Sequence, residues 1–145
     1  MSGEKFKLYA ASYLILKNDN QLLLSLRQNT MFMDGYYSLV AGHFDGNEPA
    51  SRACLREAEE EANIKLTPKD IKAVHIMNRK SPSREYMDVY FLAENYKEEI
   101  KNMEPEKCGG LEWFEIDKLP NNTAPYIKFV LENYSKGIFY SEWEW

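Results

Sequence analysis

The feature that most constrains this chain is the stretch 42–64, in which a glycine-containing loop runs into a glutamate-rich helical segment. Glu57, Glu60 and Glu61 stand three and four residues apart, so on a helix their side chains project from one face. Two carboxylates about 4 Å apart repel each other by roughly 4 kcal/mol at an effective dielectric constant near 20. A divalent cation offsets this repulsion, because Mg²⁺ and Mn²⁺ bind oxygen ligands and commonly share them with phosphate. The spacing therefore predicts a metal-dependent hydrolase of phosphate bonds.

A solvated helix face is the alternative explanation, with Arg52 and Arg56 balancing the acidic charge. That alternative accounts for the glutamate run alone. It does not account for Gly42 and Glu48 at their distances upstream, or for Pro49 at a plausible first helical position. We therefore favour the metal site, as a motif supported by its context.

The stretch resembles the Nudix box of the MutT-like hydrolases, Gly-x5-Glu-x7-Arg-Glu-U-x-Glu-Glu-x-Gly-U, in which U is a bulky aliphatic residue. The matching positions are Gly42, Glu48, Arg56, Glu57, Ala58, Glu60, Glu61, Asn63 and Ile64. Two of them depart from the pattern. Ala58 is smaller than usual, which predicts close packing of the helix, and Asn63 replaces a glycine. Asparagine is the next-best residue for the left-handed conformation that ends a helix.

The resemblance implies an α/β protein with the Nudix fold, an α/β/α sandwich whose mixed sheet carries the box as a strand–loop–helix. The order of elements expected from the sequence agrees with such layers. Strands are expected at 6–16, 21–27, 38–41, 71–78, 86–94 and 111–116, and a second helix at 125–135 after a Thr123 cap. A polar turn is expected at 79–84. The chain, residues 1–145, is expected to form a single Nudix hydrolase domain.

The resemblance also implies a site for Mg²⁺ or Mn²⁺. The expected ligands are the Gly42 carbonyl and the carboxylates of Glu57, Glu60, Glu61 and Glu106, with Glu104 as the alternative to Glu106. The expected catalytic residues are Arg56, Glu57 and Glu60. Glu57 would accept the proton of the attacking water, a role typically worth 10²–10⁴-fold in rate, although which glutamate is the base stays open. Arg56 would orient a carboxylate, and Glu48 would support the loop at the helix start.

Outside the box, three residues are expected to bind substrate. Arg27 stands where MutT-like enzymes carry a phosphate-binding arginine, and His43 is placed to touch phosphate. Asn122 resembles the asparagine that reads a purine edge, although an asparagine in a turn needs no such role.

The preferred reaction is hydrolysis of a nucleoside diphosphate linked to another group. The preferred substrate is a (d)NTP, canonical or oxidised as in 8-oxo-dGTP, split to NMP and pyrophosphate. ADP-ribose or a nucleotide sugar is the alternative substrate, and a nucleotide-sensing module without catalysis is the alternative class. The intact acidic set argues against a pure sensor.

Charge and hydropathy exclude other partners. A net charge of −5 and a pI near 5.2 give no basic footprint for a nucleic-acid polymer. The apolar run 8–16 is too short to cross a membrane, so a cytoplasmic protein with reduced cysteines is expected. The aromatic tail 137–145 is expected to pack on the body or on the partner chain of a homodimer.

Overall fold

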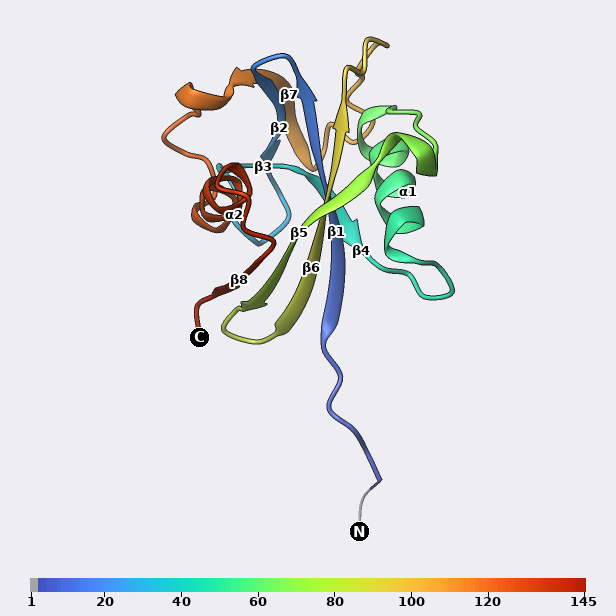
Figure 1. Ribbon diagram of the computed structural model, residues 1–145, viewed down its shortest axis with the longest axis vertical. Coiled ribbons are helices and arrows are strands. Elements are labelled where there is room, and N and C mark those ends of the chain that lie inside the picture. The colour runs from blue at the N-terminus through green and yellow to red at the C-terminus, as the bar shows by residue number, and fades with distance from the viewer. Residues whose placement is uncertain (1–2) are drawn as a thin grey trace.

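The computed structural model, which describes residues 3–145, has an eight-stranded mixed β-sheet between two α-helices (Figure 1). The strands are β1 (Tyr9–Asn18), β2 (Gln21–Arg27), β3 (Tyr37–Ser38), β4 (Val40–His43), β5 (Lys72–Lys80), β6 (Glu85–Glu94), β7 (Cys108–Glu115) and β8 (Tyr140–Trp143). The helices are α1 (Ala50–Ala62) and α2 (Pro125–Ser135), and 3₁₀ turns occupy Pro68–Asp70 and Ile116–Lys118. The expected α/β/α sandwich is confirmed.

The sheet opens along one edge of β1. Its strand order is β3-β2-β1-β6-β5-β8, with β4 added to β1 and β7 added to β2. The strand β4 pairs with β1 over Ala11–Leu14, whereas β2 pairs with the same strand only at Lys17 and Asn18. The strands β2 and β4 therefore separate from each other, and side chains from both faces of the sheet can meet between them.

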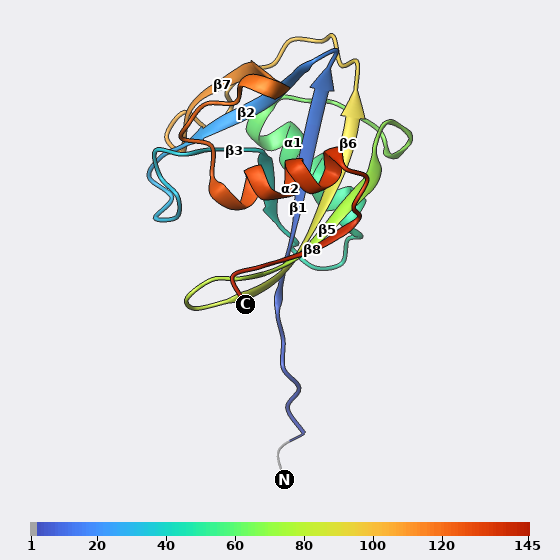
Figure 2. The same cartoon turned by 60° about the vertical axis from the view of Figure 1, so that its left-hand side comes forward.

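Each helix covers its own hydrophobic core. The side chains of β1 alternate between the two faces, so that Ile15 packs with Ile127 and Val130 of α2 while Leu14 and Leu16 belong to the core under α1. Figure 2 shows α2 lying across the sheet in front of β1, with α1 behind it. The two cores hold the sheet, and with it the strands that line the candidate site.

The helix α1 lies close to the sheet because its buried side chains are small. Ala53, Ala58 and Ala62 have no exposed surface, which confirms the close packing expected at Ala58. The helix ends at Asn63, whose φ of 58° is left-handed; the Asn63 N–H donates to the Glu59 carbonyl and the Ile64 N–H to the Ala58 carbonyl. The expected role of Asn63 is confirmed. Pro49 precedes the first helical residue as the N-cap.

Two local expectations differ from the structure. The strand β5 continues to Lys80 with Arg79 buried, so the turn of the β5–β6 hairpin is limited to 81–84, where the Ser81 N–H donates to the Arg84 carbonyl. Thr123 does not cap α2, since its Oγ1 donates to the Pro120 carbonyl and Ala124 is the N-cap.

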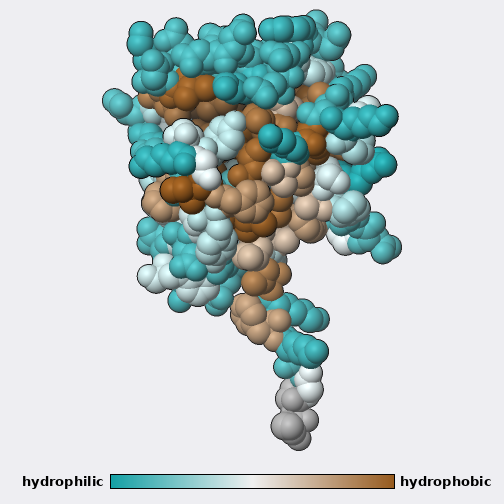
Figure 3. Space-filling model, in the orientation of Figure 1, coloured by the Kyte–Doolittle hydropathy of each residue, from teal (hydrophilic) through white to brown (hydrophobic). Residues whose placement is uncertain are grey.

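The two ends of the chain behave differently. The aromatic tail lies on the body as expected, because β8 adds to the sheet beside β5 in parallel register. Residues 3–8 extend away from the body in Figure 1, and Phe6 there is 71% exposed. Figure 3 shows hydrophobic side chains in this segment and in the middle of the molecule, below a polar upper surface. The expected homodimer stays a prediction.

Among residues 3–145, none of the helices has the length and apolar character needed to cross a membrane.

Candidate active site

A pocket of about 570 Å³ lies where β2 and β4 separate. Its walls come from β1, β2, β4, β5, β6, α1 and α2, and from the segments 29–32 and 104–108. One part of the wall is acidic and another is cationic and aromatic. The pocket therefore contains groups suited to a cation and groups suited to a phosphate or a ring.

Four carboxylates line this pocket. The helix α1 presents Glu57, Glu60 and Glu61 from one face, as their spacing predicts, and Glu104 joins them from the segment before β7. The Glu61 side chain is anchored to the sheet, since its Oε2 accepts a hydrogen bond from the Ala41 N–H at 3.2 Å. Local sequence spacing thus supplies three of the four acids, and the tertiary fold supplies the fourth.

Gly42 allows the acidic helix to approach β4. A Cβ atom at this position would lie 2.1 Å from Glu57 Cδ and 2.3 Å from its Oε1. Real Cβ atoms essentially never come closer than 3.0 Å to another heavy atom. Only glycine therefore leaves room for the Glu57 carboxyl group where it lies.

The carboxylates are crowded and partly removed from water. Burial, together with the charges of Glu57 and Glu104, raises the pKa of Glu61 to about 8. Burial also raises the pKa of Glu57, with Glu60 and Glu104 adding to it and Arg56 opposing it. Folding has placed acids where their own charges are unfavourable. A cation among them would relieve that cost.

Arg56 holds one side of the acidic group together. Its Nε and Nη2 donate to the two Glu48 oxygens at 3.2 and 2.8 Å, and its Nη1 donates to Glu57 Oε1 at 2.8 Å. Its Nη2 also donates to the His43 carbonyl at 3.1 Å. The Glu48 hydrogen bond raises the pKa of Arg56, which stays charged. The Arg56 guanidinium group thus links the loop, the strand β4 and Glu57.

Glu48 fixes the loop between β4 and α1. Besides its two bonds to Arg56, its Oε1 accepts the Asp45 N–H at 3.0 Å. Gly46 and Asn47 turn the loop with φ of 91° and 58°. These contacts place Glu48 as a support of the loop and away from the pocket, of which it is not a lining residue.

The donor set fits a hard divalent cation. Carboxylate and backbone oxygens are the ligands that Mg²⁺ and Mn²⁺ take, and the pocket offers both kinds. In the part of the chain that the structure describes, no three acidic, histidine or cysteine side chains already form a complete ion site. Glu57 is hydrogen-bonded to Arg56 and Glu61 to the Ala41 N–H, so hydrogen-bond donors of the protein hold these two carboxylates.

Two of the residues expected to bind substrate lie in the pocket. Arg27 donates from Nε to the Phe32 carbonyl at 2.7 Å and from Nη2 to Thr30 Oγ1 at 3.0 Å, which also orders the loop after β2. The His43 ring lies 5.8 Å from the Tyr9 ring and 5.6 Å from the Tyr86 ring. Partial burial lowers the pKa of His43, and nearby arginines lower it further, so its ring is neutral at pH 7.

Asn122, the third residue expected to bind substrate, and Glu106, an expected metal ligand, lie outside the pocket. Asn122 is exposed, its Nδ2 donates to the Gly35 carbonyl at 3.0 Å, and it is not among the residues that line the pocket. Glu106 is exposed and is not among the residues that line the pocket, whereas Glu104 is. We therefore correct the fourth carboxylate to Glu104 and remove Asn122 from the pocket.

The sequence did not reveal the cationic and aromatic part of the wall. Arg79, Tyr86, Tyr126 and Phe32 line the pocket together. The sequence signal for Arg79 is its position in the strand. His75, Met77 and Arg79 occupy every second residue of β5, so their side chains share one face, and all three are buried. An arginine at such a position is half of a buried pair, here with Asp88.

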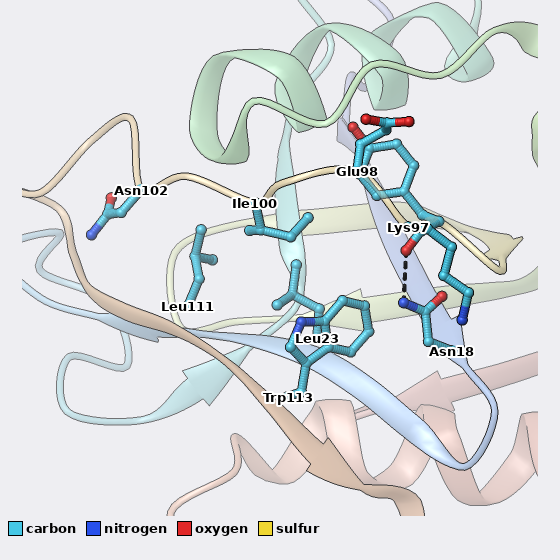
Figure 4. Close-up of a pocket in the computed structure, with 9 residues that line it drawn as sticks. Asn18, Leu23, Lys97, Glu98, Ile100, Asn102, Leu111 and Trp113 are labelled. Atoms are coloured by element: carbon cyan, nitrogen blue, oxygen red, sulfur yellow. Dashed lines mark hydrogen bonds between the residues drawn. The ribbon is translucent and has the colours of Figure 1, made fainter.

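A separate cavity of about 490 Å³ lies on the α1 face between β2, β7 and the segment 96–102. Figure 4 shows Leu23, Ile100 and Trp113 around it, with the Asn18 Nδ2 donating to the Tyr96 carbonyl at 2.7 Å. It has no cluster of carboxylates, so the acidic pocket is the candidate active site.

Comparisons with known proteins point to one family. The family model of the NUDIX domain matches residues 7–133. The NAD-capped RNA hydrolase NudC of Photorhabdus laumondii is 27% identical over 105 residues, which are 72% of this chain. The chain spans only 38% of the length of that relative. An 8-oxo-dGTP diphosphatase of Proteus vulgaris is 27% identical over 97 residues, 67% of this chain and 85% of that protein.

Among solved structures, the MutT NUDIX hydrolase of Burkholderia pseudomallei superposes with a TM-score of 0.79 at 25% identity. The superposition covers 88% of this chain and 98% of the other. The shared fold therefore extends well beyond the box.

Proposed function

The chain belongs to the NUDIX domain family, and from this premise we propose that it is a metal-dependent hydrolase of nucleoside diphosphate derivatives. The preferred substrate is a (d)NTP, canonical or oxidised, which is split to a nucleoside monophosphate and pyrophosphate. The relative named as an 8-oxo-dGTP diphosphatase supports this substrate class, because this chain covers most of that protein.

The observation that carries the proposal is the fit between Gly42 and Glu57. A strand glycine leaves room for a carboxylate that would otherwise clash with it, and Arg56 holds that carboxylate at 2.8 Å. Glu60, Glu61 and Glu104 line the same pocket. A group of four acids in one pocket, with the backbone of Gly42 beside them, is suited to divalent cations and has no evident purpose in folding.

Different side chains would bind the cation, accept the proton and orient the proton acceptor. Glu57, Glu60, Glu61 and Glu104, with the Gly42 carbonyl, would hold the Mg²⁺ or Mn²⁺. Such ions neutralise phosphate oxygens and lower the pKa of a bound water. Glu57 is our candidate for the group that accepts the proton of the attacking water. Arg56 orients it, since its guanidinium is itself fixed by both oxygens of Glu48.

The phosphate chain of the substrate needs a cation on its other side. Arg27 lines the pocket and uses Nε and Nη2 to order residues 30–32, while its Nη1 makes no hydrogen bond with the described residues. We assign this Nη1 to a phosphate oxygen. The neutral His43 ring forms the neighbouring wall.

A nucleotide panel with Mg²⁺ tests the proposal. Release of pyrophosphate from a (d)NTP supports triphosphate cleavage, whereas AMP and ribose 5-phosphate from ADP-ribose would support the alternative substrate. Glu57→Gln should lower kcat by at least about 10²-fold, the lower range of a lost general base. Glu59→Gln is the matched control, because Glu59 is exposed on the same helix and does not line the pocket.

Both variants should unfold at the temperature of the wild type. Wild-type turnover in Glu57→Gln would remove this residue from the mechanism. Tight nucleotide binding without any product, from a folded protein supplied with Mg²⁺ and Mn²⁺, would favour the sensing module over the enzyme.

A further inference from the structure

Arg79 is a buried cation at the wall of the candidate active site. It lies on β5 with 4% of its surface exposed and lines the pocket together with Tyr86 and Tyr126. Its partner Asp88, on the neighbouring strand β6, has no exposed surface. Replacing a buried ion pair with apolar residues of similar size is often neutral or stabilising. The fold alone therefore gives no strong reason for an arginine at this position.

The hydrogen bonds of Arg79 distinguish its three guanidinium nitrogens. Nε donates to Asp88 Oδ2 at 2.6 Å, and Nη2 donates to Asp88 Oδ1 and to the Tyr13 hydroxyl, both at 3.3 Å. Nη1 donates to no group of the described residues, and it is not among the buried polar atoms without a partner. Its two N–H groups are therefore not used by the described residues, and the side chain that carries them lines the pocket.

Aromatic rings surround the guanidinium group. Its Cζ lies 4.0 Å from the centre of the Tyr86 ring, 4.7 Å from that of Tyr126 and 5.7 Å from that of Phe32. All three rings also line the pocket. A flat ligand can pack against such rings while its polar edge meets the free Nη1. A nucleobase has that shape.

The charge of Arg79 is already balanced. Asp88 accepts two of its hydrogen bonds, so the pair as a whole has little net charge to offer a phosphate. The group that Nη1 meets should therefore be a neutral acceptor, such as a ring keto oxygen. There is room for a base, because a second cavity of about 470 Å³ shares Phe32, Arg79 and Tyr126 with the pocket.

We propose that Arg79 determines specificity by donating from Nη1 to the C6 keto oxygen of a purine base. This inference rests on the proposed function, in that the base belongs to the nucleotide that is hydrolysed. Guanine and hypoxanthine present O6 and N7 as acceptors, whereas adenine presents an amino donor at C6. A donor that faces another donor leaves both unpaired, which disfavours adenine.

The test compares dITP with dATP, which differ at C6 and in the protonation of N1 and share all other groups. In the wild type, kcat/KM for dITP should exceed that for dATP by about 10-fold to about 100-fold, as for one good base contact. In Arg79→Lys the ratio should fall to within about twofold, because one ammonium cannot hold Asp88 and a base in the fork geometry of a guanidinium.

A second variant removes the ion pair as a unit. Arg79→Met/Asp88→Asn leaves no buried charge unpaired, so it keeps the inference testable where Arg79→Lys does not fold. The ratio should also fall to within about twofold in this variant. Lys72→Met is the control, because Lys72 is an exposed cation of the same strand and lines neither the pocket nor the second cavity. It should keep the wild-type ratio.

Binding of dIMP and dAMP, measured by calorimetry, gives a readout that needs no turnover. If the folded protein cleaves neither dITP nor dATP, the proposed triphosphate cleavage is refuted, while a preference for binding dIMP that disappears in both Arg79 variants would still support base reading. Cleavage of both nucleotides at equal efficiency would overturn the inference and leave the hydrolase intact. A dITP preference that survives in the Arg79 variants would overturn it equally.

Discussion

Substitution of Gly42 by alanine should impair catalysis without unfolding the protein. The added Cβ would lie 2.1 Å from Glu57 Cδ, and ordinary contact begins at 3.4 Å, so the carboxyl group must move by 3.4 − 2.1 = 1.3 Å. A displacement of about 1 Å in a reacting group can cost about 10²-fold in rate. We therefore expect kcat/KM to fall by about 10²-fold.

The same change should have a small net effect on stability. Moving Glu57 weakens its 2.8 Å hydrogen bond to Arg56, which is worth about 1 kcal/mol between partly exposed groups. Alanine also restricts the unfolded chain, which returns about 0.4–1 kcal/mol where the native backbone has no positive φ. The two effects nearly cancel, since Glu57 can turn away at its flexible end.

Steady-state kinetics and thermal unfolding measure these two effects separately. Gly110→Ala is the control, because a Cβ there meets nothing within 4 Å and its φ is not positive. That variant should retain wild-type kinetics and gain about 0.4–1 kcal/mol of stability, because alanine restricts its unfolded chain in the same way. Wild-type kcat/KM in Gly42→Ala would refute the argument that Gly42 makes room for a functional Glu57. A large loss of stability would instead assign Gly42 a structural role.

Two further predictions concern stability. Arg56→Met should lower the free energy of unfolding in urea by about 2 kcal/mol, because Glu48 and Glu57 lose charge-assisted hydrogen bonds. The control Arg52→Met, at an exposed position of the same helix, should change it by less than about 0.5 kcal/mol. Equal effects of the two substitutions would show that Arg56 does not hold the loop and Glu57 together. Burial lowers the pKa of His75, so its contribution to stability is complete above about pH 6.5 and is lost as the pH falls below that value. Between about pH 6.5 and about pH 5, the unfolding temperature of His75→Asn should therefore fall less than that of the wild type. An equal fall in both proteins would show that His75 is not the source of this pH dependence.

The parts of the site that the sequence predicts are those governed by local spacing. Glu57, Glu60 and Glu61 share a helix face because three and four residues make about one turn, and the structure places all three in the pocket. Asn63 ends the same helix because asparagine tolerates the left-handed conformation that the C-cap requires. In both cases the deciding contacts lie within one turn of the residue.

The parts that the sequence misses depend on contacts distant along the chain. Glu104 and Glu106 lie in an irregular segment without periodicity, so spacing cannot tell which one faces the pocket. The turn in which the Lys107 N–H donates to the Glu104 carbonyl leaves Glu104, and not Glu106, at the pocket wall. Arg79 looks like part of a polar turn until Asp88, nine residues later, is known to lie beside it. A charged side chain is read as exposed unless its partner can be identified.

The topology explains how acids and aromatic rings reach one pocket from opposite faces of a sheet. If β2 and β4 continued side by side along β1, the sheet would separate the α1 side from the α2 side. They do not, because β4 pairs with β1 at Ala11–Leu14 and β2 pairs with it only at Lys17 and Asn18. Through the resulting opening, Glu57 approaches from α1 while Tyr126 approaches from α2. The split edge of β1 thus brings carboxylates to one part of the pocket wall and aromatic rings to another.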